Sequence, residues 1–317
     1  MAEVRIRDIW KAKKRISSIV SNSPLIQSHT LSRMTNKKVY LKLETANEVG
    51  AFKLRGAANK ILSLPLDVQK RGVTTFSTGN HGLAVAYVAT LLGIKPIICI
   101  SNRVPEAKVK QLQQYGAELE VIGHSQDDAA RHCEALHKKY NMTVIPPFDD
   151  REVIAGQGTI GLEILEDLPQ VDHCLVPLSG GGLLSGVGLA LKSANEGTTI
   201  TGISVDGASA MAESIKKGHP TGVPEKDTVA DSLLGGIGSQ NKFTLSIVQS
   251  VMDELVLLQE NSIQKGLSHL FYQEKLIVEG AAAVGAGALL DKKLKKIGDN
   301  VVLIISGNNV DVSTLFK

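Results

Sequence analysis

The segment that decides the fold runs Cys174-Leu175-Val176-Pro177-Leu178-Ser179-Gly180-Gly181-Gly182-Leu183-Leu184-Ser185-Gly186. It opens with an apolar run, passes through three consecutive glycines and continues as a stretch with helical periodicity. The pattern predicts a buried strand over Cys174–Leu178 and a helix over Leu183–Ala194. A strand that leads through a glycine-rich loop into a helix is the repeating unit of α/β folds, so we expect that fold class.

Short apolar runs alternate with amphipathic stretches along almost the whole chain. The other predicted strands are Val39–Leu43, Val73–Ser77, Pro96–Ile100, Leu119–Ile122, Ile200–Val205, Leu255–Leu258 and Val301–Ile305. The other predicted helices are Gly82–Leu92, Ala107–Tyr115, Asp127–Tyr140, Ser262–Tyr272 and Ala281–Leu290, with one more near the N-terminus marked by Ile6, Ile9, Trp10, Ile16 and Ile19. This alternation predicts open parallel sheets covered by helices, with ligands bound where strands end and helices begin.

The chain of 317 residues is long enough for two packed domains, and its 43% of hydrophobic residues can fill their cores. We predict a small domain over residues 72–149, closed by the break at Pro146-Pro147. Residues 1–71 and 150–317 would form the large domain on either side of it.

The balance of charge argues against nucleic acid and against anionic membranes as partners, because 35 Lys and Arg face 32 Asp and Glu, a net charge of +3. No apolar run is long enough to span a bilayer. Cys99, Cys133 and Cys174 are scattered, and two of them stand in apolar runs. This pattern is typical of reduced, buried thiols and predicts a cytoplasmic protein.

One lysine stands in an unusual context in Ala51-Phe52-Lys53-Leu54-Arg55-Gly56-Ala57, just before a predicted helix. The apolar neighbours of Lys53 favour desolvation, which disfavours the ammonium and makes the neutral, nucleophilic amine easier to reach. A lysine that holds an aldehyde cofactor as a Schiff base needs this property. The alternative, commoner for an isolated lysine, is a stem that lies along apolar surface with its charge in water.

Two loops follow predicted strands and open into helices. In Ser77-Thr78-Gly79-Asn80-His81-Gly82, hydroxyls, an amide and free N–H groups at a helix start suit a carboxylate; an N-capped turn is the alternative. In Ser179–Gly186, the glycines let the backbone wrap a phosphate. A dinucleotide site is the rival, because Asp206 ends the next predicted strand, but Ser185 interrupts the Gly-x-Gly-x-x-Gly pattern.

Two further motifs lie near the C-terminus. Ser306-Gly307-Asn308-Asn309 follows a predicted strand, where the Ser306 hydroxyl could bond a neutral ring nitrogen; an ordinary turn is the alternative. Glu279-Gly280-Ala281-Ala282-Ala283 places a carboxylate at the start of a helix. We expect Glu279 to cap that helix and to stay ionised in the field of the helix dipole.

The motifs occur in the order Phe-Lys-x-Arg-Gly-Ala, Ser-x-Gly-Asn-His, glycine loop, Val-Glu-Gly-Ala and Ser-Gly-x-Asn. With the early Ser23-Pro24-Leu25, they make the chain resemble the threonine dehydratases among the fold-type II enzymes that use pyridoxal 5′-phosphate (PLP). The resemblance runs from about Pro24 to Asp311. It implies a fold like that of the tryptophan synthase β-subunit, a PLP cofactor, and conversion of L-threonine or L-serine to a keto acid and ammonia. A C₂ homodimer is the default expectation for such an enzyme.

The resemblance also implies residue roles. Lys53 would carry the cofactor and move the substrate's α-proton, with Phe52 behind the ring. Asn80 would bond the phenolic oxygen of the ring, and Ser306 would face its nitrogen. The residues implied to bind the phosphate are Ser179, Gly180, Gly181, Gly182 and Leu183. Those implied to bind the substrate carboxylate are Ser77, Thr78, Asn80 and His81.

The chain departs from the family pattern in several places. Thr78 stands where many threonine dehydratases have Ala and related serine racemases have a catalytic Ser. A serine or aspartate racemase, with Thr78 as a second catalytic residue, is therefore the alternative function. Ser232 replaces a common Gly near the ring. Asp206 resembles one acidic position of the racemases' metal site, but Ala212 stands at the other, so we predict no metal.

Two further alternatives stay open. The length and the segment Asp231–Gly238 resemble the dehydratases of hydroxyectoine utilisation, which makes such a substrate an option. We expect no C-terminal regulatory domain like that of the biosynthetic threonine dehydratases, and therefore no isoleucine feedback. A nucleotide-binding protein without covalent chemistry would show no visible chromophore, and it leaves Lys53 and Ser306 without a role.

Overall fold

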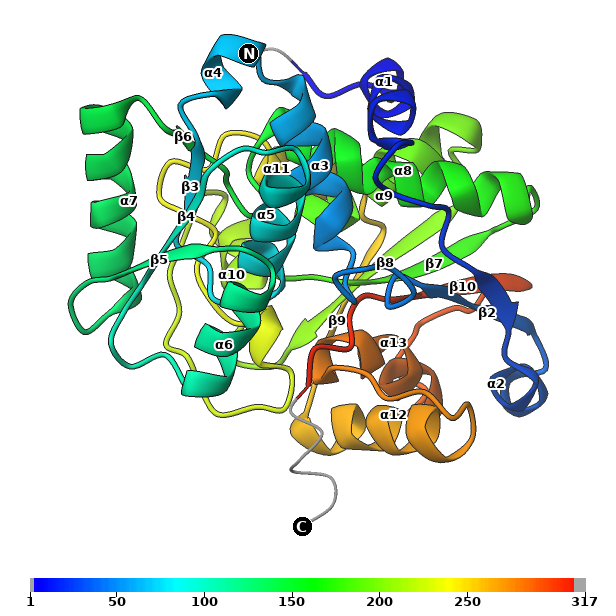
Figure 1. Cartoon of the computed structure of the whole chain (residues 1–317). Helices are drawn as coiled ribbons and strands as arrows, with labels where there is room; N and C mark the ends of the chain where they lie inside the picture. Colours follow the sequence, from blue (N-terminus) through cyan, green and yellow to red (C-terminus); the bar gives the residue numbers. More distant parts are fainter. Residues whose placement is uncertain (1–2, 311–317) are drawn as a thin grey trace.

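The computed structural model describes residues 3–310, so Asp311, where the resemblance ends, lies outside the described part. Its framework is one sheet of six strands and one of four, both flanked by helices (Figure 1). This arrangement confirms the predicted α/β class with two mainly parallel sheets.

The larger sheet has the strand order β1-β2-β10-β7-β8-β9. Its strands are β1 (Leu25–Gln27), β2 (Lys38–Leu43), β10 (Asn300–Ile305), β7 (His173–Pro177), β8 (Thr199–Val205) and β9 (Glu254–Leu258). All neighbours are parallel except β1 and β2, which pair antiparallel. The sequence pattern did not predict β1. Only the short helix α2 (His29–Thr35) joins these two strands, and a parallel pair needs a longer crossover.

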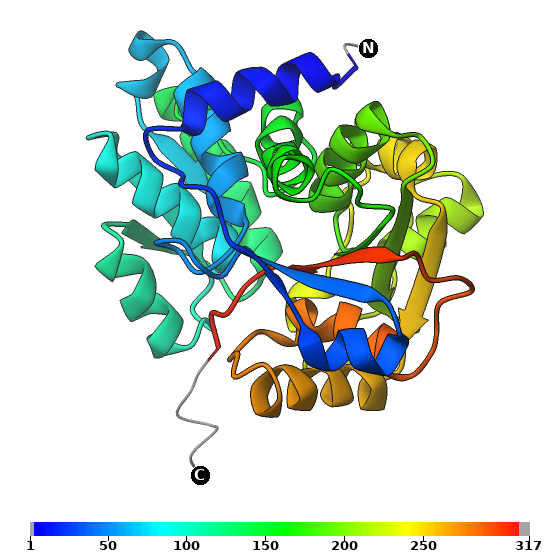
Figure 2. The same cartoon turned by 90° about the vertical axis from the view of Figure 1, so that its right-hand side faces the viewer.

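Helices cover both faces of the larger sheet (Figures 1 and 2). One layer contains α1 (Ile6–Ile16), α8 (Arg151–Asp167), α9 (Gly182–Ala194), α10 (Ala210–Lys217) and α11 (Thr244–Val251). The other contains α2, α12 (Glu260–Tyr272) and α13 (Gly280–Leu290). Strand β10 shows the reason, because Val302 and Ile304 pack into the first layer while Val301, Leu303 and Ile305 pack into the second.

The smaller sheet is wholly parallel, in the order β5-β4-β3-β6. Its strands are β3 (Val73–Thr75), β4 (Pro96–Ile100), β5 (Glu118–Val121) and β6 (Thr143–Val144). The helices after its strands are α5 (Asn80–Leu91), α6 (Glu106–Gln114) and α7 (Gln126–Tyr140). Helix α3 (Lys53–Ser63), followed by the short α4 (Leu66–Gln69), shares this core, since Leu54 and Ile61 pack with Val73 and Leu83. The domain boundaries at residues 72 and 149 remain a prediction.

Most predicted strands and helices are present within one or two residues of their expected bounds. The long helix α8 is the main element that the sequence pattern missed. Its glycines obscure the helical periodicity, and packing explains them: a Cβ at Gly156 would lie 2.6 Å from the carbonyl oxygen of Arg55, and one at Gly158 would lie 3.0 Å from that of Gly186. Helix α8 can therefore approach α3 and α9 closely. In the described residues, no helix is long and apolar enough to cross a membrane.

Candidate active site

The predicted site motifs meet where the strands of the two sheets end and helices begin. The segment that leads into Lys53 runs beside the segment after β10, where the N–H of Phe52 donates to the carbonyl of Ser306 over 3.0 Å. The N–H of Glu279 donates to the carbonyl of Gly307 over 3.0 Å. Three motifs that are far apart in the sequence thus converge at one place.

Lys53 is the first residue of α3 and is partly exposed. Its Nζ donates to the carbonyl oxygen of Pro147 over 2.6 Å and lies 5.2 Å from the centroid of the Phe52 ring. Burial lowers the pKa of Lys53 from its ordinary 10.5 to about 8, and no carboxylate of the described residues offsets this. The amine therefore reaches its neutral, nucleophilic form more readily than a surface lysine does.

The glycine loop lies between β7 and α9. Gly181, the residue before the helix, has a φ of 87°, a conformation that a side chain would strain. A Cβ at Gly180 would lie 2.4 Å from Cδ1 of Phe148, so backbone and ring pack in direct contact. No side chain caps the first turn of α9 among the described residues, which leaves N–H donors there for an anion. Ser179 precedes these glycines, and Leu183 is buried in the first turn.

A cluster of four polar residues, here called the Glu279 cluster, joins the two sheets; its members are Asn80, Ser232, Glu279 and Asn309. Asn80 Nδ2 donates to both carboxylate oxygens of Glu279, over 2.8 and 3.0 Å. Ser232 Oγ and the N–H of Asn309 each donate to the same carboxylate over 3.0 Å. Asn309 Nδ2 donates to Asn80 Oδ1 over 2.7 Å, so both ends of the Asn80 amide are fixed. Asn80 opens α5 beside the smaller sheet, and Glu279 precedes α13 on the larger one.

The expectation that the Glu279 side chain caps the helix was wrong. Glu279 stands at the N-cap of α13, but its side chain makes no capping hydrogen bond. Burial raises the pKa of Glu279, in spite of hydrogen bonds from Asn80, Asn309 and Ser232 that lower it, so burial works against the ionised form. No separate role was predicted for Asn309, although the Ser-Gly-x-Asn motif contains it. Pro147 was predicted only as part of the break at Pro146-Pro147, and Phe148 had no predicted role.

The residues predicted to bind a carboxylate surround the start of α5. Ser77 and Thr78 are partly exposed just before the helix, and His81 is buried in its first turn. His81 Nε2 donates to the carbonyl of Ile145 over 2.8 Å, and its Nδ1 is buried without a partner among the described residues. Burial, and then the charge of Lys53, lower the pKa of His81 to about 3. The imidazole is therefore neutral at pH 7.

Asp206, the acidic residue considered for binding a metal or a ribose, is hydrogen-bonded to other residues of the protein. The Asp206 carboxylate accepts a hydrogen bond from Gln259, and its carbonyl oxygen accepts one from Lys226. Among the residues whose side chains the structure describes, no three of His, Cys, Asp or Glu gather as a metal site.

These groups fit the chemistry of PLP. Lys53 offers an amine to an aldehyde, and the start of α9 offers N–H donors to a phosphate. Ser306, 5% exposed at the end of β10, offers a hydroxyl to a ring nitrogen. The Glu279 cluster holds the Asn80 amide in one orientation between the two sheets.

Known proteins support the same interpretation. The family described as "Pyridoxal-phosphate dependent enzyme" matches residues 16–307. A putative threonine dehydratase of Sinorhizobium fredii is 43% identical, over 98% of this chain and 94% of that protein. The L-threonine ammonia-lyase of Thermotoga maritima is 37% identical, over 98% of this chain and 77% of that protein. The structure of maize serine racemase superposes with a TM-score of 0.94 at 32% identity, covering 99% of this chain and 96% of that one. The chain belongs to the pyridoxal-phosphate-dependent enzyme family.

Proposed function

We propose that this protein is an ammonia-lyase that converts a β-hydroxy amino acid such as L-threonine or L-serine into a 2-keto acid and ammonia. The relatives named as threonine dehydratase and L-threonine ammonia-lyase, which align over 98% of this chain, support this activity. The structural observation that carries the proposal is the amine of Lys53, free of any carboxylate partner in the described residues and with its pKa lowered to about 8. A non-covalent nucleotide-binding role would leave this amine without a purpose.

PLP, when bound, supplies an electron sink for the α-carbon of the substrate. Lys53 Nζ would bind its aldehyde carbon and later take up the α-proton of the substrate. The N–H groups of Ser179, Gly180, Gly181, Gly182 and Leu183 would hold the phosphate. Phe52 would lie behind the ring, and Ser232 would line the ring pocket through the Glu279 cluster.

Two side chains would set the electronic character of the ring. Asn80 would face the phenolic oxygen, in the orientation that Glu279 and Asn309 impose. Ser306 would face the ring nitrogen with a neutral hydroxyl, which, unlike a carboxylate, does not hold a proton on that nitrogen. A less electron-withdrawing ring suits elimination of the β-hydroxyl better than reactions that need a long-lived carbanion.

The substrate carboxylate would lie at the start of α5, near Ser77, Thr78, Asn80 and His81. The neutral His81 ring already donates to Ile145. Its part in binding would therefore come from the backbone N–H at the positive end of the helix.

The decisive experiment follows keto-acid release from L-threonine by the PLP-loaded protein, with a coupled reductase as the detector. Sustained formation of 2-oxobutyrate, and of pyruvate from L-serine, is the expected result. Bound cofactor without keto acid from either substrate would contradict the proposal and direct attention to other β-hydroxy amino acids, including those of hydroxyectoine breakdown.

A racemase is the second candidate, and two observations favour it: the Thr78 hydroxyl at the start of α5 and the likeness to maize serine racemase. Chiral chromatography of L-serine and L-aspartate recovered from the same reactions tests it. D-serine or D-aspartate formed faster than keto acid would make racemisation the main activity. Traces well below the keto acid would leave the lyase as the principal function.

We also propose that the enzyme is a cytoplasmic homodimer with residues 72–149 as its small domain. The cysteines Cys99, Cys133 and Cys174 are free and buried, which suits a reducing compartment. A two-fold dimer is the commonest assembly among soluble homo-oligomers. Light scattering of the loaded protein tests the dimer.

A further inference from the structure

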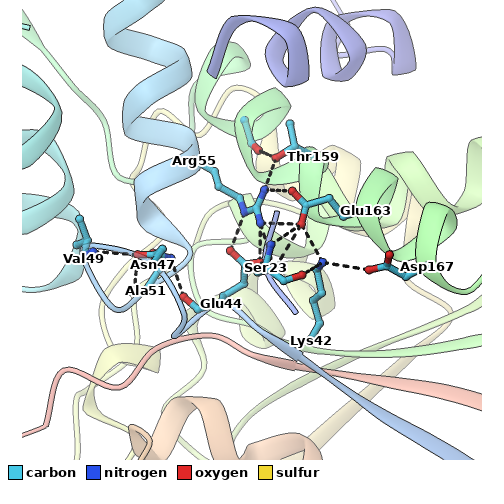
Figure 3. A network of polar contacts seen from close by, with 11 residues as sticks. Ser23, Lys42, Glu44, Asn47, Val49, Ala51, Arg55, Thr159, Glu163 and Asp167 are labelled. Atoms are coloured by element: carbon cyan, nitrogen blue, oxygen red, sulfur yellow. Dashed lines mark hydrogen bonds and ion pairs between the residues drawn. The ribbon is translucent and has the colours of Figure 1, made fainter. Parts of the chain in front are cut away.

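Arg55, two residues after Lys53, lies at the centre of a buried ionic network (Figure 3). It is 1% exposed. Its Nε and Nη2 donate to the two oxygens of Glu44 over 2.7 and 2.9 Å. Its Nη1 and Nη2 donate to the two oxygens of Glu163 over 2.6 and 2.9 Å. Thr159 and Ser23 accept further hydrogen bonds from Nη1 and Nη2, over 3.1 and 3.2 Å. The guanidinium is thus held in one plane and one orientation.

The network is balanced in charge. Lys42, fully buried on β2, lies 2.8 Å from Glu163 and donates to the carbonyl of Ser23 over 2.6 Å. Two buried cations therefore face the two buried carboxylates, while the half-exposed Asp167 lies 3.9 Å from Lys42. Burying four charges is costly, and an apolar core of the same volume is often at least as stable. Stability alone is therefore a weak reason for this network.

The network holds together the two ends of the loop that leads from β2 to Lys53. Glu44 follows the last residue of β2, and its pairing with Arg55 joins the two ends of the connection between β2 and α3. Inside that loop, Asn47 Nδ2 donates to the carbonyls of Glu44 and Ala51 over 2.8 and 3.1 Å, as Figure 3 shows. Glu163 adds a contact from α8. The first turn of α3 is therefore fixed from β2, from α8 and from its own loop.

Helix geometry connects this network to Lys53. Successive residues of an α-helix are about 100° apart, so residues i and i+2 point to nearly opposite sides. Arg55 points into the network, and Lys53 points to the carbonyl of Pro147 on the other side. Rotation of the first turn that loosened the Arg55 contacts would swing the lysine amine out of its place.

We propose that Arg55 is a positioning residue for Lys53: held by Glu44 and Glu163, it fixes the rotation of the first turn of α3 and with it the place of the Lys53 amine. The inference rests on the proposed function of Lys53. It adds that the environment of the amine is set from the opposite side of the helix by a group that touches neither cofactor nor substrate.

The test measures the titration of Lys53 in the full-length protein without added cofactor. The labelling rate of Lys53 by acetic anhydride is followed across pH by peptide mass mapping. Two variants keep the net charge of the network: Arg55→Lys, which loses the two-pronged contacts, and the double variant Glu44→Gln with Arg55→Met. Because charge is conserved, a shift in either variant reports a displaced amine and not a changed field.

The expected pKa of Lys53 is about 8 in the wild type. In each folded variant we expect it to rise by about one unit or more toward the ordinary value, because a displaced amine regains water. Lys60→Met is the matched control, since Lys60 lies on the same helix and pairs with Asp150 over 2.6 Å. It should leave the Lys53 titration unchanged.

Loss of stability in the Arg55 variants with an unchanged Lys53 titration would reduce Arg55 to a structural residue and overturn the inference. If the double variant alone folds, its titration decides the question. A wild type that titrates near pH 8 but releases no keto acid would contradict the proposed function and leave the positioning role intact.

Discussion

Lys53 and Arg55 are two cations in the first turn of α3 whose surroundings are opposite. Lys53 is partly exposed, donates to a carbonyl, and has its pKa lowered by burial to about 8. Arg55 is buried against two carboxylates. Burial alone would lower the pKa of Arg55, but Glu44 and then Glu163 raise it above its usual range. The protein keeps one cation ready to lose its proton and the other permanently charged.

The difference shows that the partners, and not the depth of burial, decide what a buried cation can do. A carboxylate beside Lys53 would stabilise the ammonium and remove the nucleophile. Loss of the carboxylates beside Arg55 would leave an uncompensated buried charge. Four predictions test this contrast between the two residues.

The largest effect is expected for Lys53→Ala, which should reduce keto-acid release from L-threonine to the level without enzyme. The nucleophile and the proton acceptor are lost together, whereas no ion pair of the described residues is broken. Coupled-reductase assays and thermal unfolding measure the two effects. Lys53→Arg serves as the control that keeps the charge, since arginine does not lose its proton. Turnover by either folded variant would contradict the role of Lys53.

Arg55→Met should lower the free energy of unfolding by about 3–5 kcal/mol, because it leaves Glu44 and Glu163 with Lys42 as their only buried cation. Urea unfolding followed by circular dichroism measures the loss. The double variant with Glu44→Gln should recover part of this loss, because the remaining buried pair of Lys42 and Glu163 has no net charge. A cost below about 1 kcal/mol for the single change would show that water reaches the network.

The pH dependence of stability should differ between the wild type and Lys53→Met. Lys53 is protonated up to about pH 10.5 in the unfolded chain and only up to about pH 8 in the folded one. Between these values the unfolded chain binds more protons, so the stability contributed at Lys53 rises with pH. Below pH 8 the buried ammonium is a full penalty. Any stability advantage of Lys53→Met should therefore shrink from about pH 8 to about pH 10.5, as urea unfolding would show. A constant difference would mean that the pKa of Lys53 is not lowered.

Local sequence patterns were enough to predict the surroundings of Lys53. The alternation of strands and helices, the glycine loop and the apolar neighbours of Lys53 are patterns within a few residues, and the structure places the glycine loop between β7 and α9 as expected. Desolvation of Lys53 could be inferred because Phe52 and Leu54 are adjacent to it. Helix α8 was missed because its glycines serve contacts with other helices.

The surroundings of Arg55 depend on partners that are distant in the chain. Arg55 and Glu163 are 108 positions apart, and Asn80 and Glu279 are 199 apart. A charged residue next to an apolar run is predicted to be exposed unless its partner is known. The sequence therefore did not indicate that Lys42, Glu44 and Arg55 are buried. The same limit explains the error at Glu279, where a local rule predicted a helix cap and a long-range contact to Asn80 prevailed.

The smallest effect is expected at Lys60, the third cation of α3. Its pair with Asp150 is partly exposed, the two side chains being 19% and 17% exposed. Asp150 also caps α8 through the N–H groups of Glu152 and Val153, and Lys60→Met leaves that cap intact. The change should cost about 1 kcal/mol or less, and salt should reduce it further. Urea unfolding at low and high salt measures both. A loss of unfolding free energy equal to that of Arg55→Met would mean that every ion pair on this helix contributes the same stability. The stability data would then not distinguish Arg55 from the other cations of α3.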